Sequence, residues 1–318
     1  MRSVFFLDDL LTGRIKMTKI AVQILYFNSH QFILHTLANC FSHVDKIFLS
    51  YSPSPWSAYN SEARSEFKNQ SSLDIIRRSI HYSKVEMVEG VWETEEEQRE
   101  ACRIIAKEQG FDFLIVQDAD EFYLPEDYKL NIKQMVENPQ YEVYQTPWIN
   151  FWKSTHYALV HKQHLGVYNT LYSTCPLFAL NLRLPVKFES RRVPKNTTTV
   201  FQLKGICFHL SYVFSDLDMF TKISTWGHAN QVNKNWFKWK WMAWHLGKRN
   251  INPINSVEWV EAIPFTGTLP AELLNFKNPA HISIELSWVD RLHERLFDFY
   301  QSLLFQLRTW RAKIRQRK

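Results

Sequence analysis

Three acidic side chains stand within four positions, directly after a short apolar run. The run Phe113–Val116 is typical of a strand buried on both faces of a sheet, and Asp118, Asp120 and Glu121 follow it. Because a buried bare charge is costly, we expect these carboxylates just past the strand, where water or a cation compensates them. Asp118 and Asp120 are two apart, so an extended backbone would point both side chains the same way. Such paired oxygen ligands indicate a site for Mg²⁺ or Mn²⁺, although an isolated Asp-x-Asp is more often a plain polar turn.

The elements around this motif alternate between strand and helix. Thr94-Glu95-Glu96-Glu97 is typical of a capping box that begins a helix, and Gly110 is expected to end that helix before the acidic strand. The alternation predicts an α/β fold with a Rossmann-like, mostly parallel sheet that is flanked by helices. The expected elements are strands over Lys19–Tyr26, Val44–Ser50 and Lys84–Val91, helices over Gln31–Ser42 and Thr94–Gln109, and a loop over Pro53–Gln70.

The carboxyl ends of the expected strands define one candidate binding site. Ligands of parallel sheets bind beyond these ends, where the strand order reverses. We therefore expect Tyr26, Asn28, Ser50 and Glu93 to lie beside the acidic motif and to contact a ligand. After Pro125 the pattern predicts further, partly antiparallel strands, over Tyr141–Thr146, Leu177–Arg183 and Thr198–Cys207.

The composition excludes several classes of protein. The chain of 318 residues has 45% hydrophobic and 22% charged residues, which is ordinary for a globular protein. It has 8 Gly and lacks the glycine-rich motifs that cradle phosphates. Residues 308–318 carry six Lys and Arg and no acid, which equals the formal net charge of +6. The rest of the chain is therefore close to neutral, and a globally basic nucleic-acid-binding domain is not indicated.

Four widely spaced cysteines and the lack of a long apolar segment suggest a cytoplasmic location. Cys40, Cys102, Cys175 and Cys207 form no Cys-x-x-Cys pair, so neither a zinc site nor a dense disulfide framework is predicted. No run reaches the length of about 18 apolar residues that a membrane span needs. We expect residues 1–16 to be an N-terminal extension that precedes the first strand.

With these motifs in order, the chain resembles the GT-A-fold glycosyltransferases, in particular the large family-2-like group. The resemblance covers roughly Lys19–Trp244, and its strongest piece runs from Glu93 to Tyr123. A second piece is Gly205–Val213, and Lys222 and Trp226-Gly227-His228 follow it as in bacterial and viral members. The chain lacks the Gln-x-x-Arg-Trp motif of processive, cellulose-synthase-like members, so a polymerising membrane synthase is not expected.

The resemblance implies a metal-dependent transfer of a sugar from a UDP- or GDP-sugar to a hydroxyl group. Asp118, Asp120 and His209 would then bind Mn²⁺ or Mg²⁺, which would stabilise the charge on the departing diphosphate. Arg99 would contact the pyrophosphate or pair with Asp118, although an exposed helix residue without such a role is the alternative. Asp118 would more often contact the ribose or a metal-bound water than the metal itself. His209 could equally be a hydrogen-bonded core residue, and His228 has a weaker claim to a contact with the acceptor or phosphate. The acceptor could be a glycan, a lipid-linked sugar or a protein.

An inverting transfer needs a general base for the attacking hydroxyl group. The family places this carboxylate well downstream of the metal motif, which makes Asp216, Asp218 and Glu189 the candidates. Ser215-Asp216-Leu217-Asp218 also matches the N-cap of a helix, and that structural role competes with catalysis.

Aromatic residues suit both a packed core and a sugar-binding groove. Five tryptophans fall between positions 226 and 244, and we expect most of them to pack, with one or two lining a groove. Trp148 and Trp152 are expected to border the acceptor side. The tryptophans of the cluster are Trp226, Trp236, Trp239, Trp241 and Trp244.

The last segment predicts an amphipathic helix with a basic end. Apolar residues recur every three or four positions from Trp288 to Leu303, and this face could dock on the domain, on a second subunit or on an anionic membrane. We therefore expect a glycosyltransferase domain over residues 17–250 and a C-terminal helical extension over 251–318. The pattern leaves the oligomeric state open.

Two other functions remain open from the sequence. A metal-dependent phosphohydrolase or phosphotransferase could use the same carboxylates, but Phe122 stands where an aspartyl-nucleophile motif needs a threonine. A non-catalytic carbohydrate- or nucleic-acid-binding module could use the aromatic residues and the basic tail. Such a module would not need the acidic cluster at Asp118–Glu121.

Overall fold

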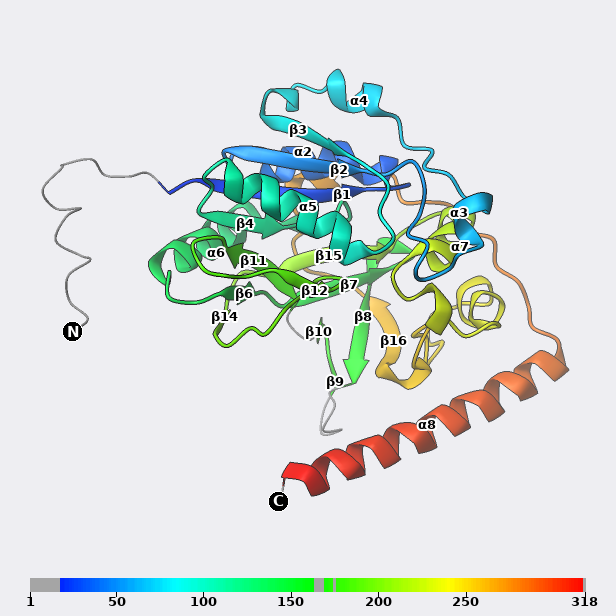
Figure 1. Cartoon of the computed structure of the whole chain (residues 1–318). Coiled ribbons are helices and arrows are strands. Elements are labelled where there is room, and N and C mark those ends of the chain that lie inside the picture. The colour runs from blue at the N-terminus through cyan, green and yellow to red at the C-terminus, as the bar shows by residue number, and fades with distance from the viewer. Residues whose placement is uncertain (1–17, 163–168, 174–175, 317–318) are drawn as a thin grey trace, which may run out of the picture.

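The computed structural model describes residues 18–162, 169–173 and 176–316. The expected N-terminal extension, residues 1–16, lies outside these described residues, as do Cys175 and the last two residues of the basic tail. The described chain forms two seven-stranded sheets and a small two-stranded one, with helices around them and one long C-terminal helix (Figure 1).

The first sheet confirms the predicted α/β class. Its strand order is β14-β6-β11-β4-β1-β2-β3, and β1, β2, β3 and β4 run parallel to one another. Only β11 runs antiparallel to its neighbours, so the sheet is mostly parallel, as predicted. The strands are β1 (Ile20–Tyr26), β2 (Lys46–Tyr51), β3 (Val85–Glu89), β4 (Phe113–Val116), β6 (Val143–Gln145), β11 (Leu177–Asn181) and β14 (Val200–Gln202).

Helices cover both faces of the first sheet. The helix α2 (His30–Phe41) packs Ile33 and Leu37 on one face, and α5 (Glu95–Glu108) packs Cys102 and Ala106 on the other. The start of α5 is as predicted, because the Thr94 hydroxyl accepts a hydrogen bond of 3.2 Å from the Glu97 N–H. Its end is as predicted too, since Gly110 adopts a φ of 77° that a residue with a side chain rarely adopts. The other helices of the N-terminal half are α3 (Ala63–Glu66), which lies in the expected loop, α4 (Leu73–Arg77), η1 (Tyr82–Lys84) and α6 (Pro125–Glu137).

The second sheet was not predicted as a separate layer. Its order is β16-β8-β7-β15-β5, with β10 beside β7 and β9 beside β8. The predicted strand over Thr198–Cys207 is wrong in one respect, because β14 and β15 lie there in different sheets. The strands are β5 (Glu121–Tyr123), β7 (Trp148–Trp152), β8 (Ser154–Lys162), β9 (Asn169–Thr170), β10 (Tyr172–Ser173), β15 (Cys207–Tyr212) and β16 (Trp259–Pro264).

The segment expected as a helical extension, residues 251–318, contains a strand of this sheet. β16 pairs with β8, and its residues Val260 and Ala262 are buried in the core. The two-stranded sheet consists of β12 (Phe188–Ser190) and β13 (Val193–Pro194). The C-terminal half also contains α7 (Asp216–Thr225), η2 (Ala229–Gln231), the π-helical turn η3 (Phe237–Met242), η4 (Ser256–Glu258), η5 (Ala271–Leu273) and α8 (Trp288–Gln316).

The acidic motif lies where the chain crosses from one sheet to the other. β4 belongs to the first sheet and β5 to the second, and only Gln117–Asp120 link them. The link is a turn in which the Glu121 N–H donates a hydrogen bond of 3.0 Å to the Asp118 carbonyl oxygen. The expectation of an extended backbone is therefore wrong, because the chain must change direction to leave one sheet and enter the next.

None of the helices among the described residues is both long enough and apolar enough to cross a membrane. The long helix α8 runs along the edge of the molecule, beneath the second sheet in the view of Figure 1.

Candidate active site

A pocket of about 490 Å³ lies at the carboxyl ends of β1, β2 and β4. This is where a mostly parallel sheet binds its ligands, so the predicted position of the site agrees with the structure. A second pocket of about 560 Å³ adjoins it. The two share a wall formed by Trp148, Val193, His209, Ser211, Trp226 and His228.

Asp118 lies in the first pocket between two arginines. Its Oδ1 accepts a hydrogen bond of 2.8 Å from Arg99 Nη2, and its Oδ2 accepts one of 3.1 Å from Arg192 Nη1. Burial alone would raise the pKa of this carboxyl, but the two guanidinium groups outweigh burial and hold the pKa below its usual value. Asp118 is therefore ionised at neutral pH. Of the two roles expected for Arg99, the structure shows the pairing with Asp118.

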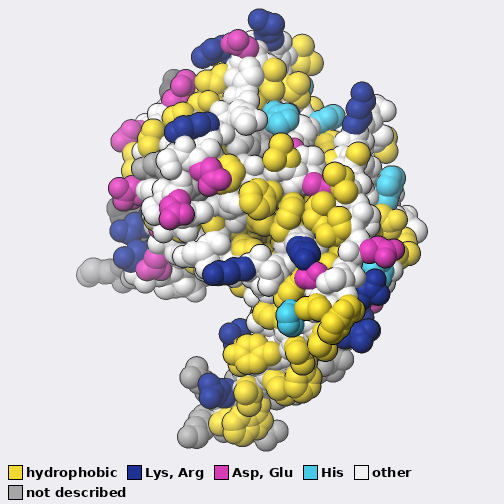
Figure 2. Space-filling model, turned by 90° about the vertical axis from the view of Figure 1, so that its right-hand side faces the viewer, with side chains coloured by type: hydrophobic (Ala, Val, Ile, Leu, Met, Phe, Trp, Pro, Cys, Tyr) yellow, Lys and Arg dark blue, Asp and Glu magenta, His cyan; other side chains and the backbone are white. Residues whose placement is uncertain are grey.

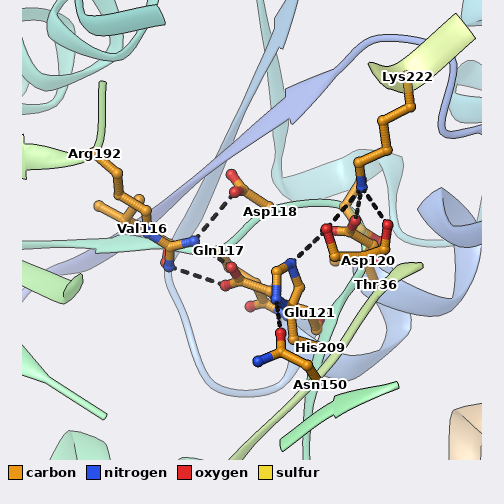
Figure 3. Close-up of polar contacts among 12 residues, drawn as sticks. Thr36, Val116, Gln117, Asp118, Asp120, Glu121, Asn150, Arg192, His209 and Lys222 are labelled. Carbon is orange, nitrogen blue, oxygen red and sulfur yellow. Dashed lines mark hydrogen bonds and ion pairs between the residues drawn. The ribbon is translucent and has the colours of Figure 1, made fainter. Parts of the chain in front are cut away.

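Asp120 faces a different set of partners. Its Oδ2 accepts a hydrogen bond of 2.8 Å from the Lys222 ammonium group, and its Oδ1 lies 3.5 Å from His209 Nε2 (Figure 3). The same ammonium group donates to the Ser211 carbonyl oxygen at 2.9 Å and to the Ser211 hydroxyl at 3.0 Å. Burial tends to raise the pKa of Asp120, but Lys222 and then His209 outweigh it and hold this pKa far below its usual value.

Glu121 and Arg192 form a bidentate pair at the base of the motif. Glu121 is fully buried, and both of its oxygens accept hydrogen bonds from the Arg192 guanidinium group. Arg192 also donates to the carbonyl oxygens of Val116 and Leu177, at 2.6 Å and 2.7 Å. It thus ties the end of β4 to β11. Arg192 was not among the predicted site residues, because nothing in the local sequence around position 192 links it to an acid that lies 71 residues away.

His209 is held by an amide that it shares with a second histidine. Its Nδ1 lies 2.7 Å from Asn150 Oδ1, and Asn150 Nδ2 lies 3.2 Å from His161 Nε2. An amide nitrogen only donates, so His161 Nε2 accepts from Asn150 Nδ2, and an amide oxygen only accepts, so His209 Nδ1 donates to Asn150 Oδ1. Burial, with His209 adding to it, lowers the pKa of His161 to about 4, so His161 is neutral. His209 therefore presents Nε2 toward Asp120 and the pocket.

The predicted metal ligands come together, but their placement does not fit a divalent ion. Both oxygens of Asp118 face arginines, and Oδ2 of Asp120 faces Lys222. Within the described part of the chain, no group of three His, Cys, Asp or Glu is arranged to hold a metal. A divalent ion prefers several oxygen ligands that are not already neutralised, and Arg99, Arg192 and Lys222 supply the compensating charge here. Metal binding by Asp118, Asp120 and His209 stays a prediction.

The predicted ligand contacts are divided between the pocket and the core. Arg99 and Asp118 line the first pocket, and so does Asn28, whose amide holds the loop at Lys68 and Gln70. Tyr26, Ser50 and Glu93 do not line either pocket. Tyr26 and Ser50 are fully buried within their strands, because the pleat turns these side chains into the packed layers rather than toward the strand ends. The Glu93 N–H donates to Glu97, and this contact supports the start of α5.

Of the three candidate bases, one lies in the pocket. Asp216 lines neither pocket, and its carboxylate accepts hydrogen bonds from Trp241 Nε1 and the Ile282 N–H, each at 2.8 Å. Glu189 is exposed on β12 and also lies outside both pockets. Asp218 lines the first pocket and accepts a hydrogen bond of 2.6 Å from the Ser215 hydroxyl. The preference for Asp216 and Glu189 as bases therefore does not agree with their positions.

The tryptophans between positions 226 and 244 divide, as expected, into mostly packed residues and one that lines a pocket. Trp236, Trp239 and Trp241 are buried in the core, whereas Trp226 lines both pockets. Trp148 also lines both pockets, and its ring lies 4.2 Å from that of His209. Trp152 is fully buried against Tyr212 and does not border a pocket, so that part of the expectation is wrong.

Comparisons with known proteins do not assign the chain to a family. No family model matches it, and no curated protein matches it. Similar solved structures include S. aureus TarS, at 12% identity over 65% of this chain and 39% of that chain, with a TM-score of 0.38. HddC from Yersinia pseudotuberculosis, in complex with GMP-PN, matches at 13% identity over 59% and 92%, with a TM-score of 0.35. A mannose-1-phosphate geranyltransferase from Thermus thermophilus matches at 13% identity over 46% of each chain, with a TM-score of 0.28.

The chain thus spans less than half the length of the S. aureus and Thermus proteins. At such low TM-scores and identities, these likenesses carry no argument about activity. The function is therefore argued from the site itself.

Proposed function

We propose that this protein is a glycosyltransferase that moves a sugar from a UDP- or GDP-sugar to a hydroxyl group of a carbohydrate-containing acceptor, with inversion. The observation that carries the proposal is a set of buried N–H donors without partners. Arg99 Nη1, Arg191 Nε, Trp148 Nε1 and Trp226 Nε1 have no hydrogen-bond partner among the described residues, and all four residues line the first pocket.

A buried donor without a partner costs about 1–3 kcal/mol, so such a group calls for a partner from outside the chain, such as water, an ion or a ligand. Four donors around one pocket favour a ligand that is rich in acceptor oxygens and carries negative charge. A diphosphate joined to a sugar has both properties, and Arg suits phosphate because of its planar fork of donors. The position beyond the carboxyl ends of the parallel strands supports a nucleotide at this pocket.

The adjoining second pocket offers space for the acceptor. The shared wall of Trp148 and Trp226 gives both pockets aromatic faces, which suit the apolar faces of sugar rings. A donor in one pocket and an acceptor in the next would meet at this wall, near His209 and Ser211.

The reaction that fits this arrangement is a direct displacement. The acceptor oxygen forms a bond to the anomeric carbon, and the bond between that carbon and the β-phosphate oxygen breaks, leaving its electron pair on the diphosphate. We assign the role of general base, which takes the proton of the acceptor hydroxyl group, to Asp218. Among the described residues that line the first pocket, the other carboxylates form ion pairs, whereas Asp218 does not. Arg99 and Arg191 line the pocket as cations for the growing phosphate charge, and Lys222 adds a third.

A panel of UDP- and GDP-sugars tests the proposal. We expect at least one donor to raise the melting temperature, because a ligand of the folded state stabilises it. Nucleoside diphosphate should then be released only when a hydroxyl acceptor is present. Release without any acceptor would favour the phosphohydrolase instead, and the absence of a shift with every donor would contradict a nucleotide-sugar enzyme.

A further inference from the structure

The long helix α8 has two chemically different sides, and one of them is attached to the domain. Its acids are Asp290, Glu294 and Asp298, and all three face the body of the protein. Asp290 pairs with Lys238 at 2.8 Å, and Lys240 pairs with Glu294 at 2.8 Å and with Asp298 at 2.7 Å. These contacts fix which side of the helix points outward.

Apolar contacts also attach this inner side of α8 to the domain. Phe297 packs beside Trp239, and Leu286, just before the helix, is buried with them. Further along, Phe305 is buried, and the Lys162 ammonium lies 4.8 Å from the centre of its ring. The helix is thus held by its inner face from its first turns to residue 305.

The outer side of α8 is a continuous apolar stripe. At about 100° per residue, the exposed apolar positions share one sector of the helix, roughly a third of its circumference. Figure 2 shows hydrophobic side chains gathered along the arm at the lower edge of the molecule, which is α8. The stripe consists of Trp288, Val289, Leu292, Leu296, Phe299, Tyr300, Leu303, Leu307, Trp310 and Ile314, which are between 39% and 77% exposed.

The charges that flank this stripe are positive. Arg291, Arg295 and Arg311 are exposed on the helix, while every acid of α8 is paired on the inner side. Residues 308–318 carry six Lys and Arg and no acid. A surface with an apolar centre and cationic borders is complementary to the headgroups and acyl chains of an anionic bilayer.

The same charges disfavour a second copy of the chain as the occupant. Two stripes packed face to face would bring their cationic borders together, and like charges across an interface are unfavourable. A tryptophan stands near each end of the stripe, at Trp288 and Trp310, and indole rings favour the headgroup level of a membrane. The 29 residues of α8 give the helix a length of about 43 Å, which is the length of membrane surface that it would cover when lying flat.

We propose that the outer face of α8 docks the protein on an anionic lipid bilayer, with the helix lying in the plane of the interface. The docking does not depend on the proposed transferase activity. It would bring the catalytic domain to acceptors at the membrane surface.

Co-sedimentation of the full chain with lipid vesicles tests this proposal. We expect binding to vesicles of phosphatidylcholine with phosphatidylglycerol and much weaker binding to phosphatidylcholine alone, with the difference decreasing as salt is added. Leu296→Glu with Phe299→Glu should weaken binding at least about tenfold, since both side chains lie in the middle of the stripe. Arg295→Gln with Arg311→Gln should weaken binding to the anionic vesicles only.

The matched control makes the same chemical change elsewhere on the surface. Ile80 is 87% exposed and Leu274 is 70% exposed, and neither lies on α8. Ile80→Glu with Leu274→Glu should bind vesicles as the unchanged protein does, and all variants should keep their melting temperature. Equal binding by the stripe variant would overturn the proposal. So would a failure of the unchanged protein to prefer anionic vesicles, or a dimer in light scattering that the stripe variant converts to monomer.

Discussion

Lys222 Nζ lies 2.8 Å from Asp120 Oδ2 and completes its hydrogen bonds with the carbonyl and hydroxyl oxygens of Ser211. An ammonium group has three N–H donors, so all of them are used. A positive charge is therefore already held by three oxygens at the place where the acidic motif predicts a divalent ion.

Binding of the nucleotide should not need a divalent ion. We expect UDP or GDP to raise the melting temperature by the same amount in EDTA as in MnCl₂, because Arg99, Arg191 and Lys222 already line the pocket with positive charge. Thermal unfolding with each nucleotide in both buffers measures this. A shift that disappears in EDTA and returns with Mn²⁺ would instead support the metal site at Asp118, Asp120 and His209.

Removal of the Lys222 charge should slow sugar transfer. Lys222→Met should lower kcat by roughly 10²-fold, since fixed charge near a leaving group acts mainly in the transition state. It also leaves Asp120 buried without its partner, so we expect a loss of stability. Asp120→Asn with Lys222→Met should recover much of the stability but not the rate. If the double variant transferred sugar at the original rate, the role of Lys222 in the reaction would be disproved.

Two neighbouring arginines should differ in what they do. Arg192→Met should cost about 3–5 kcal/mol of unfolding free energy, because Glu121 would remain buried without a partner. Both arginines line the pocket, but the Arg191 side chain contacts His228, at 3.3 Å, rather than a buried carboxylate. Arg191→Met should change stability by less than about 1 kcal/mol but weaken nucleotide binding. Urea unfolding and nucleotide titration of both variants separate the two roles, and similar stabilities would be the contrary result.

The two aspartates at the start of α7 form a second matched pair. Asp218→Asn should abolish most transfer while nucleotide binding stays intact, because the acceptor proton would have no carboxylate to accept it. Asp216→Asn should leave the reaction intact but cost about 1–3 kcal/mol of stability, since its carboxylate holds Trp241 and the chain at Ile282. Rate measurements with a saturating donor, together with urea unfolding, check both. An active Asp218→Asn enzyme would remove Asp218 as the base.

His161 should make stability depend on pH. Its pKa is lowered from 6.5 to about 4 by burial, so the unfolded chain takes up this proton as the pH falls below 6.5 while the folded chain does not. Stability should therefore fall toward low pH, by about 2 kcal/mol for this group between about pH 7 and about pH 5. His161→Gln keeps an acceptor for Asn150 and does not titrate, so it should lose less stability over this range. Urea unfolding of both proteins at the two pH values measures the difference, and equal losses would contradict a neutral His161.

Local sequence patterns determined most of the first sheet. Each of these patterns involves only residues that are close in the sequence, so the strand or helix that it forms can be recognised without knowing the fold. Examples are the apolar runs, the capping box at Thr94 and the helix end at Gly110. The family resemblance, not a local pattern, offered the pairing of Arg99 with Asp118 as one of two alternatives, and the expectation that most of the clustered tryptophans pack agrees with the structure. The amphipathic helix α8 was also predicted, because the recurrence of apolar residues every three to four positions can be recognised in the sequence alone.

Only the tertiary structure decided how the acidic motif is used. The partners of Asp118, Asp120 and Glu121 come from Arg99, Arg192, His209 and Lys222, which lie between 19 and 102 residues away. The turn at Gln117–Asp120 exists because the chain leaves one sheet for another there, and no short segment contains that information. Whether a carboxylate meets a metal ion or a protein cation depends on such long-range contacts, since the energy of a buried charge is set by whatever the fold brings within a few ångströms.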